Sequence, residues 1–159
     1  MDKLNYLIHS KLQGIQSSLK APKGQTNKFG GYTYRSAEDI LTAVKPLLAE
    51  WNCTLVISDD MVEVGGRVYV KATAVLADTE GEYTIQANGF AREAETRKGM
   101  DDSQITGSAS SYARKYALNG LFAIDDTKDA DATNDHGKKP ITPTEKISQP
   151  ANADADFEF

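Results

Sequence analysis

Basic and aromatic residues are interleaved between residues 20 and 35, where the sequence has four basic residues and no acidic one. Lys and Arg can neutralise phosphates, and flat rings can stack on bases, so a groove for a single nucleic-acid strand needs both. A solvated loop with one or two rings in the core would show the same composition. The segment therefore predicts one of these two arrangements, and its candidate DNA contacts are Lys28, Tyr32, Tyr34 and Arg35.

A helix is expected within residues 101–126, with Ser103 as its N-cap and Asn119–Gly120 as its C-cap. The acidic residues before Ser103 would lie at the positive end of the helix dipole, where negative charge is favourable. Helical spacing places small, apolar and aromatic side chains on one face, which could pack on a sheet. Its members are Ile105, Ala109, Tyr112, Ala113 and Tyr116.

The opposite face of this expected helix carries Arg114 and Lys115, which could reach phosphates. Arg97 and Lys98 precede the helix in a polar connector and form a further pair of candidate phosphate contacts. Tyr112 is a candidate for stacking on a base, although it could equally pack in the core. Tyr116 is assigned to the core.

No pattern typical of catalysis stands out, and we predict a protein that is not an enzyme and needs no cofactor. His9 and His136 fall in a helix and in a polar tail, which does not favour a histidine-based triad or metal cluster. Cys53 is the only cysteine and is expected to be a small buried residue. The glycine pairs lack the spacing of a phosphate-binding P-loop, and residues 125–131 lack the glycine and distal glutamate of a calcium loop.

A metal-dependent DNA nuclease remains the first alternative, because several carboxylates lie close together in the sequence. Such an enzyme needs carboxylates fixed on rigid elements to hold its ions, whereas these occupy a polar connector and a helix start. The residues concerned are Glu93, Glu95, Lys98, Asp101 and Asp102.

The remaining elements predict an α+β fold. Apolar spacing predicts a helix over residues 3–19 and a second over 36–51, with Pro46 expected to kink or divide the second. Ser36 and Asp39 resemble a capping box at the start of the second helix, with Asp in place of Glu. Strands are predicted at 54–58, 67–77 and 82–92, with a turn over 59–66. Short turns and alternating side chains favour an antiparallel meander with one buried face.

The 159 residues predict one domain, residues 1–126, followed by a disordered acidic tail over 127–159. The formal net charge is −5, but four basic and seven acidic residues of the tail account for −3 of it. The domain is therefore near neutral and could still bind a polyanion through one basic groove. Neither a membrane span nor a signal peptide is expected, and the predicted location is the cytoplasm, that of the host if the protein is phage-encoded.

The last six residues alternate acidic side chains with Ala155, Phe157 and Phe159, and they could bind a basic, apolar pocket on a replication or recombination protein. They resemble the acidic, phenylalanine-terminated tip of bacterial single-stranded-DNA-binding proteins, with Glu-Phe where that tip usually has Pro-Phe. An incidental polar end would look the same. The candidate partner contacts are Asp154, Asp156, Phe157 and Phe159.

Residues 107–131 resemble the signature of the essential recombination function (ERF) family of phage single-strand annealing proteins. The resemblance consists of the Gly-Ser-Ala stretch at 107–109, Tyr-Ala-Arg-Lys-Tyr-Ala-Leu at 112–118, and the aspartates of 125–131. It extends upstream through the strands to Tyr34-Arg35 and covers roughly residues 3–131, without the tail.

This resemblance implies a β-β-β-α core like that of other annealing proteins, such as the phage beta protein and the eukaryotic Rad-type mediators. It also implies a ring or filament of identical subunits that binds single-stranded DNA and pairs complementary strands without ATP, in DNA recombination and repair.

After the nuclease, the second alternative function is an adaptor that recruits replication or recombination partners through its acidic tail.

Overall fold

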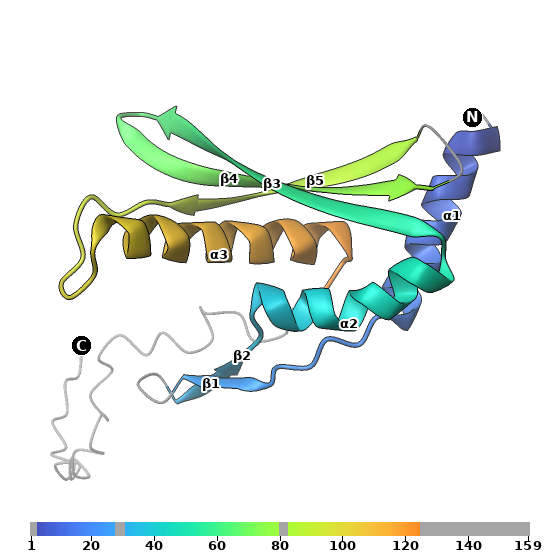
Figure 1. Cartoon of the computed structure of the whole chain (residues 1–159), viewed down its shortest axis with the longest axis horizontal. Helices are drawn as coiled ribbons and strands as arrows, with labels where there is room; N and C mark the ends of the chain where they lie inside the picture. The colour runs from blue at the N-terminus through green and yellow to red at the C-terminus, as the bar shows by residue number, and fades with distance from the viewer. Residues whose placement is uncertain (1–2, 28–30, 80–82, 125–159) are drawn as a thin grey trace, which may run out of the picture. The chain divides into compact units, whose positions relative to one another are not determined.

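A three-stranded antiparallel sheet and a long helix form the centre of the structure (Figure 1). The computed structural model describes residues 3–27, 31–79 and 83–124, without the side chains of residues 3–5, 27 and 32. It confirms the predicted α+β fold with a β-β-β-α core after two helices. No helix within this described part is long and apolar enough to cross a membrane. The elements are α1 (Lys3–Ser18), β1 (Gln25–Asn27), β2 (Tyr32–Tyr34), α2 (Ala37–Glu50), β3 (Cys53–Val64), β4 (Arg67–Asp78), β5 (Thr84–Arg92) and α3 (Asp102–Leu121).

The central strand β4 shows the alternation that the sequence predicts. Every second side chain from Val70 to Asp78 is buried, and those between are half-buried. Antiparallel partners point to the same side of a sheet, so the register Leu55↔Leu76 and Leu76↔Ile85 carries this buried face across all three strands. The buried face is the one that α3 covers.

Strand β3 is longer than the sequence predicts, because residues 59–64 belong to the strand and not to a turn. The turn consists of Gly65 and Gly66 alone, and their φ values of 60° and 71° lie in the left-handed region that favours glycine. The acidic pair Asp59–Asp60 suggested a turn. In the structure, Asp59 faces Ala72 in the ladder and its carboxylate is bound by α3.

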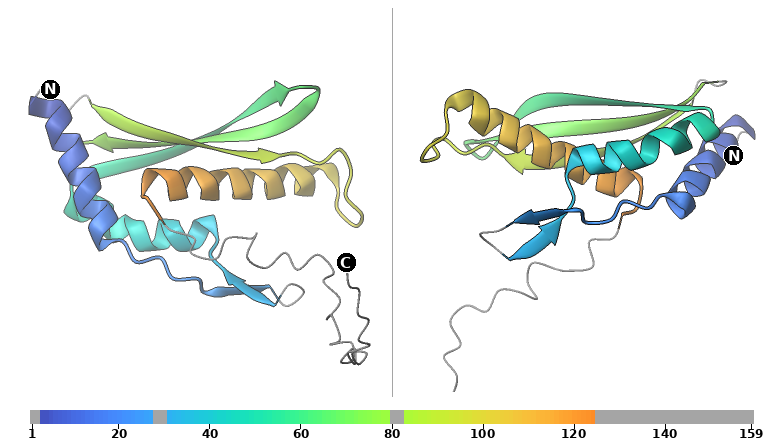
Figure 2. Two further views of the ribbon diagram at one scale, coloured as in Figure 1. Left: turned by 180° about the vertical axis from the view of Figure 1, so that it is seen from behind. Right: turned by 60° about the horizontal axis from the view of Figure 1, so that its bottom comes forward.

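Helix α3 lies close against β4 and β5, and the left view of Figure 2 shows it running beside β5. Small buried side chains at Ala109, Ala113 and Ala117 face the sheet. Gly89 on β5 makes the approach possible, since a Cβ at this position would lie 2.2 Å from the carbonyl oxygen of Ala113. The glycine and the alanine stripe thus fix how α3 packs on the sheet.

The ends of α3 differ from the predicted caps. Asp101, not Ser103, is the N-cap, and it forms a capping box with Gln104. The helix continues through Asn119–Gly120 to Leu121, and Ala123 adopts the positive φ of 51° after it. Leu118 and Leu121 are buried, so tertiary packing keeps the helix intact past the glycine.

Helices α1 and α2 extend the core beyond α3. The predicted capping box of α2 is confirmed, with Ser36 and Asp39 as its two members. Pro46 does not divide the helix, which runs as one element from Ala37 to Glu50. In α1, Ile8 and Ile15 are fully buried, and Lys11 makes a 3.0 Å ion pair with the buried carboxylate of Asp78. Helix α2 contacts both α1 and α3.

Residues 20–35 are more regular than the expected loop, because β1 and β2 pair as a short antiparallel hairpin. The register pairs Gln25 with Tyr34, which brings Tyr34 to the base of the hairpin immediately before α2. Lys28 and the predicted tail, residues 127–159, lie outside the described residues.

Candidate nucleic-acid interface

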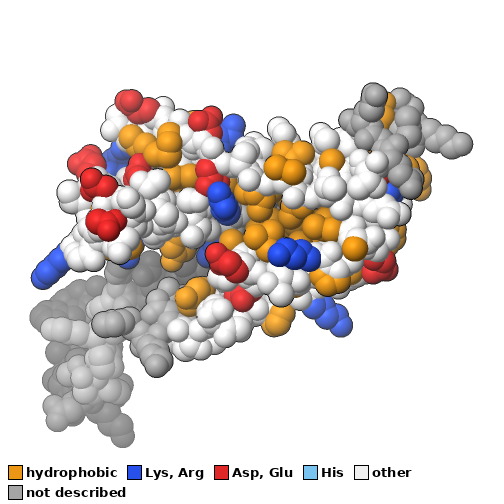
Figure 3. All heavy atoms as spheres, viewed as in Figure 1, with side chains coloured by type: hydrophobic (Ala, Val, Ile, Leu, Met, Phe, Trp, Pro, Cys, Tyr) orange, Lys and Arg blue, Asp and Glu red, His pale blue; other side chains and the backbone are white. Residues whose placement is uncertain are grey.

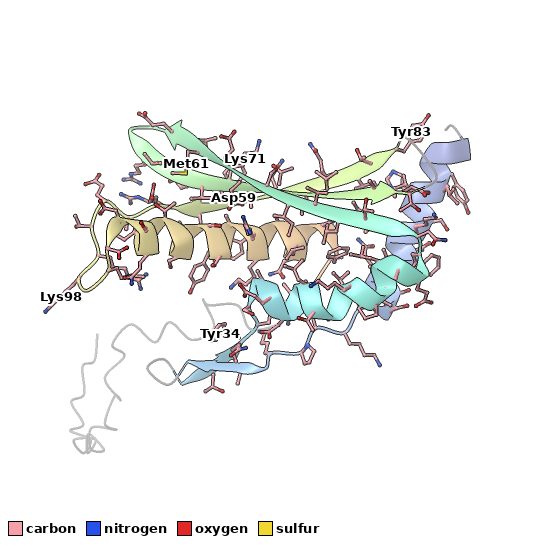
Figure 4. The ribbon with its side chains drawn as sticks, in the orientation of Figure 1. Tyr34, Asp59, Met61, Lys71, Tyr83 and Lys98 are labelled. Carbon is pink, nitrogen blue, oxygen red and sulfur yellow. The ribbon has the colours of Figure 1, made fainter. Side chains whose placement is uncertain are left out.

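The junction between β2 and α2 forms a hollow with α3 of about 340 Å³. We call it the junction hollow. Figure 4 shows Tyr34 beneath α3, at the end of the hairpin. The hollow brings together four residues that the sequence predicted from two distant segments: Tyr34, Arg35, Tyr112 and Lys115. Its complete lining is Tyr34, Arg35, Ser36, Ala37, Glu38, Ser111, Tyr112 and Lys115.

A second hollow, of about 360 Å³, lies between the end of β5 and α3, from Ile105 to Tyr116. We call it the strand-edge hollow, because β5 is the outer strand of the described sheet. Arg92 and Arg97 line it and no acidic residue of the described chain does. Its aromatic lining residues are Tyr112 and Tyr116 of α3 and Phe90 of β5, and the remaining lining is Ala91, Ala94, Ile105, Ser108 and Ala109.

A third hollow, of about 260 Å³, lies where the β3–β4 turn meets the start of α3. We call it the turn hollow. It combines Arg67 and Arg92 with three carboxylates, Glu93, Glu95 and Asp102. Glu93 accepts a hydrogen bond from the Thr106 hydroxyl, and the described residues contain no group of three His, Cys, Asp or Glu side chains that could hold a metal ion.

The three hollows adjoin one another along α3. Tyr112 lines both the junction and the strand-edge hollows. Arg92, Ala94 and Ile105 line both the strand-edge and the turn hollows. We call this succession the α3 track. Figure 3 shows one face of the molecule, on which basic side chains are scattered singly around hydrophobic ones, and not gathered in one broad basic patch.

The tyrosines of α3 are more exposed than the sequence suggested. Tyr112 is 48% and Tyr116 is 45% exposed, so the assignment of Tyr116 to the core is wrong. Alanines occupy the buried stripe at the contact with β5, which leaves no room there for a large ring. The amino group of Lys115 lies 4.8 Å from the ring centre of Tyr112 and 5.2 Å from that of Tyr116. Lys115 therefore belongs with the tyrosines and does not lie on the opposite face from them.

The guanidinium of Arg114 is directed at β3. Its Nε lies 3.0 Å from each carboxylate oxygen of Asp59, and one terminal nitrogen lies 2.9 Å from Oδ2. The hydrogen bond to Asp59 raises the pKa of Arg114 against the opposing effect of burial. The Ser110 hydroxyl donates to the same carboxylate at 2.5 Å. Arg114 is thus a link between α3 and β3.

The remaining predicted contacts lie apart from one another. Arg35 is only 9% exposed, although it lines the junction hollow. Lys98 extends from the loop before α3, away from the three hollows (Figure 4). Lys28 and the tail residues Asp154, Asp156, Phe157 and Phe159 lie outside the described residues, and the side chain of Tyr32 does too.

Sequence reasoning missed Phe90 and Arg67 as members of the track. Both belong to strands whose outward positions read as an ordinary solvated face, so neither residue type nor spacing marked them. The useful signal was the alternation of β5, which places Phe90 and Arg92 on the side away from the buried Gly89.

Comparison with known proteins identifies the family. The family model described as the ERF superfamily matches residues 8–156. The chain belongs to the ERF superfamily. The match confirms the family resemblance and extends further toward the C-terminus than the 3–131 expected from the motifs.

A curated member of the family is closely similar. The essential recombination function protein of Salmonella phage P22 is 57% identical over 129 residues. The aligned part is 81% of this chain and 60% of the phage P22 protein, so the chain spans about 60% of that relative. No solved structure matches the chain significantly.

Proposed function

We propose that this chain binds single-stranded DNA along the α3 track and anneals complementary strands during phage homologous recombination, without ATP. The strand-edge hollow carries the proposal, because its lining combines two arginines with the aromatic residues Tyr112, Tyr116 and Phe90 and has no acidic residue in its described part. Family membership and the name of the phage P22 relative support the recombination role.

Annealing sets two physical requirements that this arrangement meets. Two DNA strands repel each other, so a protein that pairs them must neutralise phosphates, and Lys and Arg do so with an affinity that depends on salt. The strand must also be held extended without sequence preference, which stacking on aromatic rings achieves. Cations and rings alternate along the track from Tyr34 and Lys115 to Arg97 and Arg92.

The proposal includes assembly of several copies, because each track is short and the domain is near neutral. Copies arranged in a ring or filament would each bind weakly, and their combined affinity would be high. It also places the protein in the host cytoplasm and assigns the segment 154–159 to recruiting a replication or recombination protein.

Strand-annealing kinetics test the proposal. Two complementary labelled oligonucleotides are mixed with the protein, with and without ATP and magnesium, and the molecular mass is followed by light scattering. We expect acceleration independent of ATP. Lys115→Ala should slow annealing, and Lys45→Ala, which removes an exposed lysine of α2 outside the track, should not. Absence of acceleration would contradict the proposal, and cleavage of the labelled DNA with magnesium would favour the nuclease.

A further inference from the structure

Two tyrosines one helical turn apart form a wall of the strand-edge hollow. The ring centres of Tyr112 and Tyr116 lie 6.2 Å apart and their planes are inclined by 40°. Nearly half of each residue is exposed. Both rings belong to the same face of α3 because residues four apart on a helix are neighbours.

Lys115 approaches both rings from the side of the junction hollow. It lines that hollow together with Tyr112, and it does not line the strand-edge hollow. Its ammonium lies within cation–π distance of both rings, which holds them in place. Both tyrosines line the strand-edge hollow, in which Arg92 and Arg97 are the basic lining residues.

The separation of the rings has a consequence for the DNA that they can accept. Successive bases in a stacked strand are about 3.4 Å apart, and the two ring centres are separated by nearly twice that distance. Two bases at the stacked spacing are therefore too close together for each of them to lie over a different tyrosine ring. Two successive bases can each lie over one ring when they are no longer stacked on each other.

We infer that Tyr112 and Tyr116 hold two successive, unstacked bases and thereby discriminate single-stranded DNA from the duplex, an inference that rests on the proposed function. A duplex keeps its bases stacked and paired, so it can offer phosphates to Arg92 and Arg97 but no bases to the tyrosines. The arginines then contribute affinity for either form, and the tyrosines contribute the preference for single strands.

Photocrosslinking locates the bases directly. The full-length chain is bound to a single strand containing 5-iodouracil, irradiated, and digested for mass spectrometry, since this base crosslinks to aromatic rings that it contacts. We expect crosslinks at Tyr112 and Tyr116. Tyr6 is the matched reference, because at 62% exposed it is more accessible than either but lies on α1, outside the track. Equal yield at Tyr6, or no yield at the pair, would overturn the inference.

Binding measurements supply a second, independent readout. Dissociation constants for a single strand and for the duplex of the same sequence are compared for the wild type, Tyr116→Ala and Tyr116→Phe, with thermal melting to confirm folding. Loss of one stacking ring should weaken single-strand binding roughly five- to a hundredfold, with duplex binding unchanged, and phenylalanine should restore it. An unchanged ratio in Tyr116→Ala would contradict this inference alone, whereas a wild-type chain that binds no DNA would contradict the proposed function as well.

Discussion

Asp59 on β3 holds the guanidinium of Arg114 on α3 through both of its carboxylate oxygens. Ser110, one turn earlier on the helix, donates to the same carboxylate. Helix α3 packs mainly on β4 and β5. The contact between Asp59 and Arg114 therefore connects the remaining strand of the sheet, β3, to the helix. Arg114 was predicted to contact phosphate, and in the structure its guanidinium is bound by Asp59.

Arg114→Ala and Asp59→Asn are expected to destabilise the fold by similar amounts, about 1 kcal/mol each, because the pair is partly exposed. The double variant should be scarcely less stable than either single one, since both changes remove the same contact. Urea denaturation of the four proteins measures this. Additive losses would show that the two residues do not act as a pair.

The acid stability of the protein should depend on Asp59. Burial raises its pKa, but the hydrogen bonds from Arg114 and Ser110 and the charge of Arg114 outweigh burial and lower the pKa below the usual value. A carboxyl group with a lowered pKa stabilises the fold fully above its unfolded pKa of about 3.9, and this contribution is lost as the pH falls through the folded value.

Urea midpoints at pH 7 and pH 3 measure this contribution. The wild type should lose more stability than Asp59→Asn over that interval, because the variant has no carboxyl group to protonate. The same loss in both proteins would assign the acid sensitivity to other carboxylates. Thr73→Val, which removes an exposed hydrogen bond to Asn88 on the sheet, is a control without a titrating group.

Gly89→Ala should destabilise the protein by about 1–3 kcal/mol or more, as overpacking of a close contact does. The added methyl group would lie 2.2 Å from the Ala113 oxygen and 2.4 Å from the Ala117 nitrogen, and both are backbone atoms that cannot turn aside. Gly107→Ala is the matched control: it adds the same group to open space on α3 and should stabilise the helix by up to about 1 kcal/mol. Thermal melting compares them, and equal stability of the two variants would mean that α3 can shift away from β5.

The sequence predicted the elements whose patterns are local. The alternation of β4 and the capping box of Ser36 and Asp39 depend on neighbouring residues alone, and both are confirmed. The extent of β3 was not predictable in this way. Asp59 is a residue type typical of turns, and its place in a strand depends on its contact with Arg114, which is far along the chain. The exposure of Tyr116 likewise depends on the contact between Gly89 and the alanines of α3.

The candidate site could be predicted by residue type but not by arrangement. The segments containing Tyr34 and Lys115 each looked suited to nucleic acid, and the fold of α2 beside α3 brings them to one hollow. Arg114 and Lys115 are adjacent in the sequence and looked equivalent. Only the tertiary structure distinguishes them, because Arg114 contacts the carboxylate of Asp59, whereas Lys115 lies over the rings of Tyr112 and Tyr116.

Lys115→Ala and Arg114→Ala should therefore have different effects on single-strand binding. On a single strand, each phosphate contact contributes about 0.7 to the slope of log affinity against log salt concentration. Lys115→Ala should lower the magnitude of that slope by about 0.7 and leave thermal stability nearly unchanged. Arg114→Ala should lower stability and keep the slope, since its charge is neutralised by Asp59. Affinities measured across a series of salt concentrations, with Lys45→Ala as the exposed control, distinguish the two. A reduced slope in Arg114→Ala would instead mean that Arg114 leaves Asp59 for a phosphate when DNA binds.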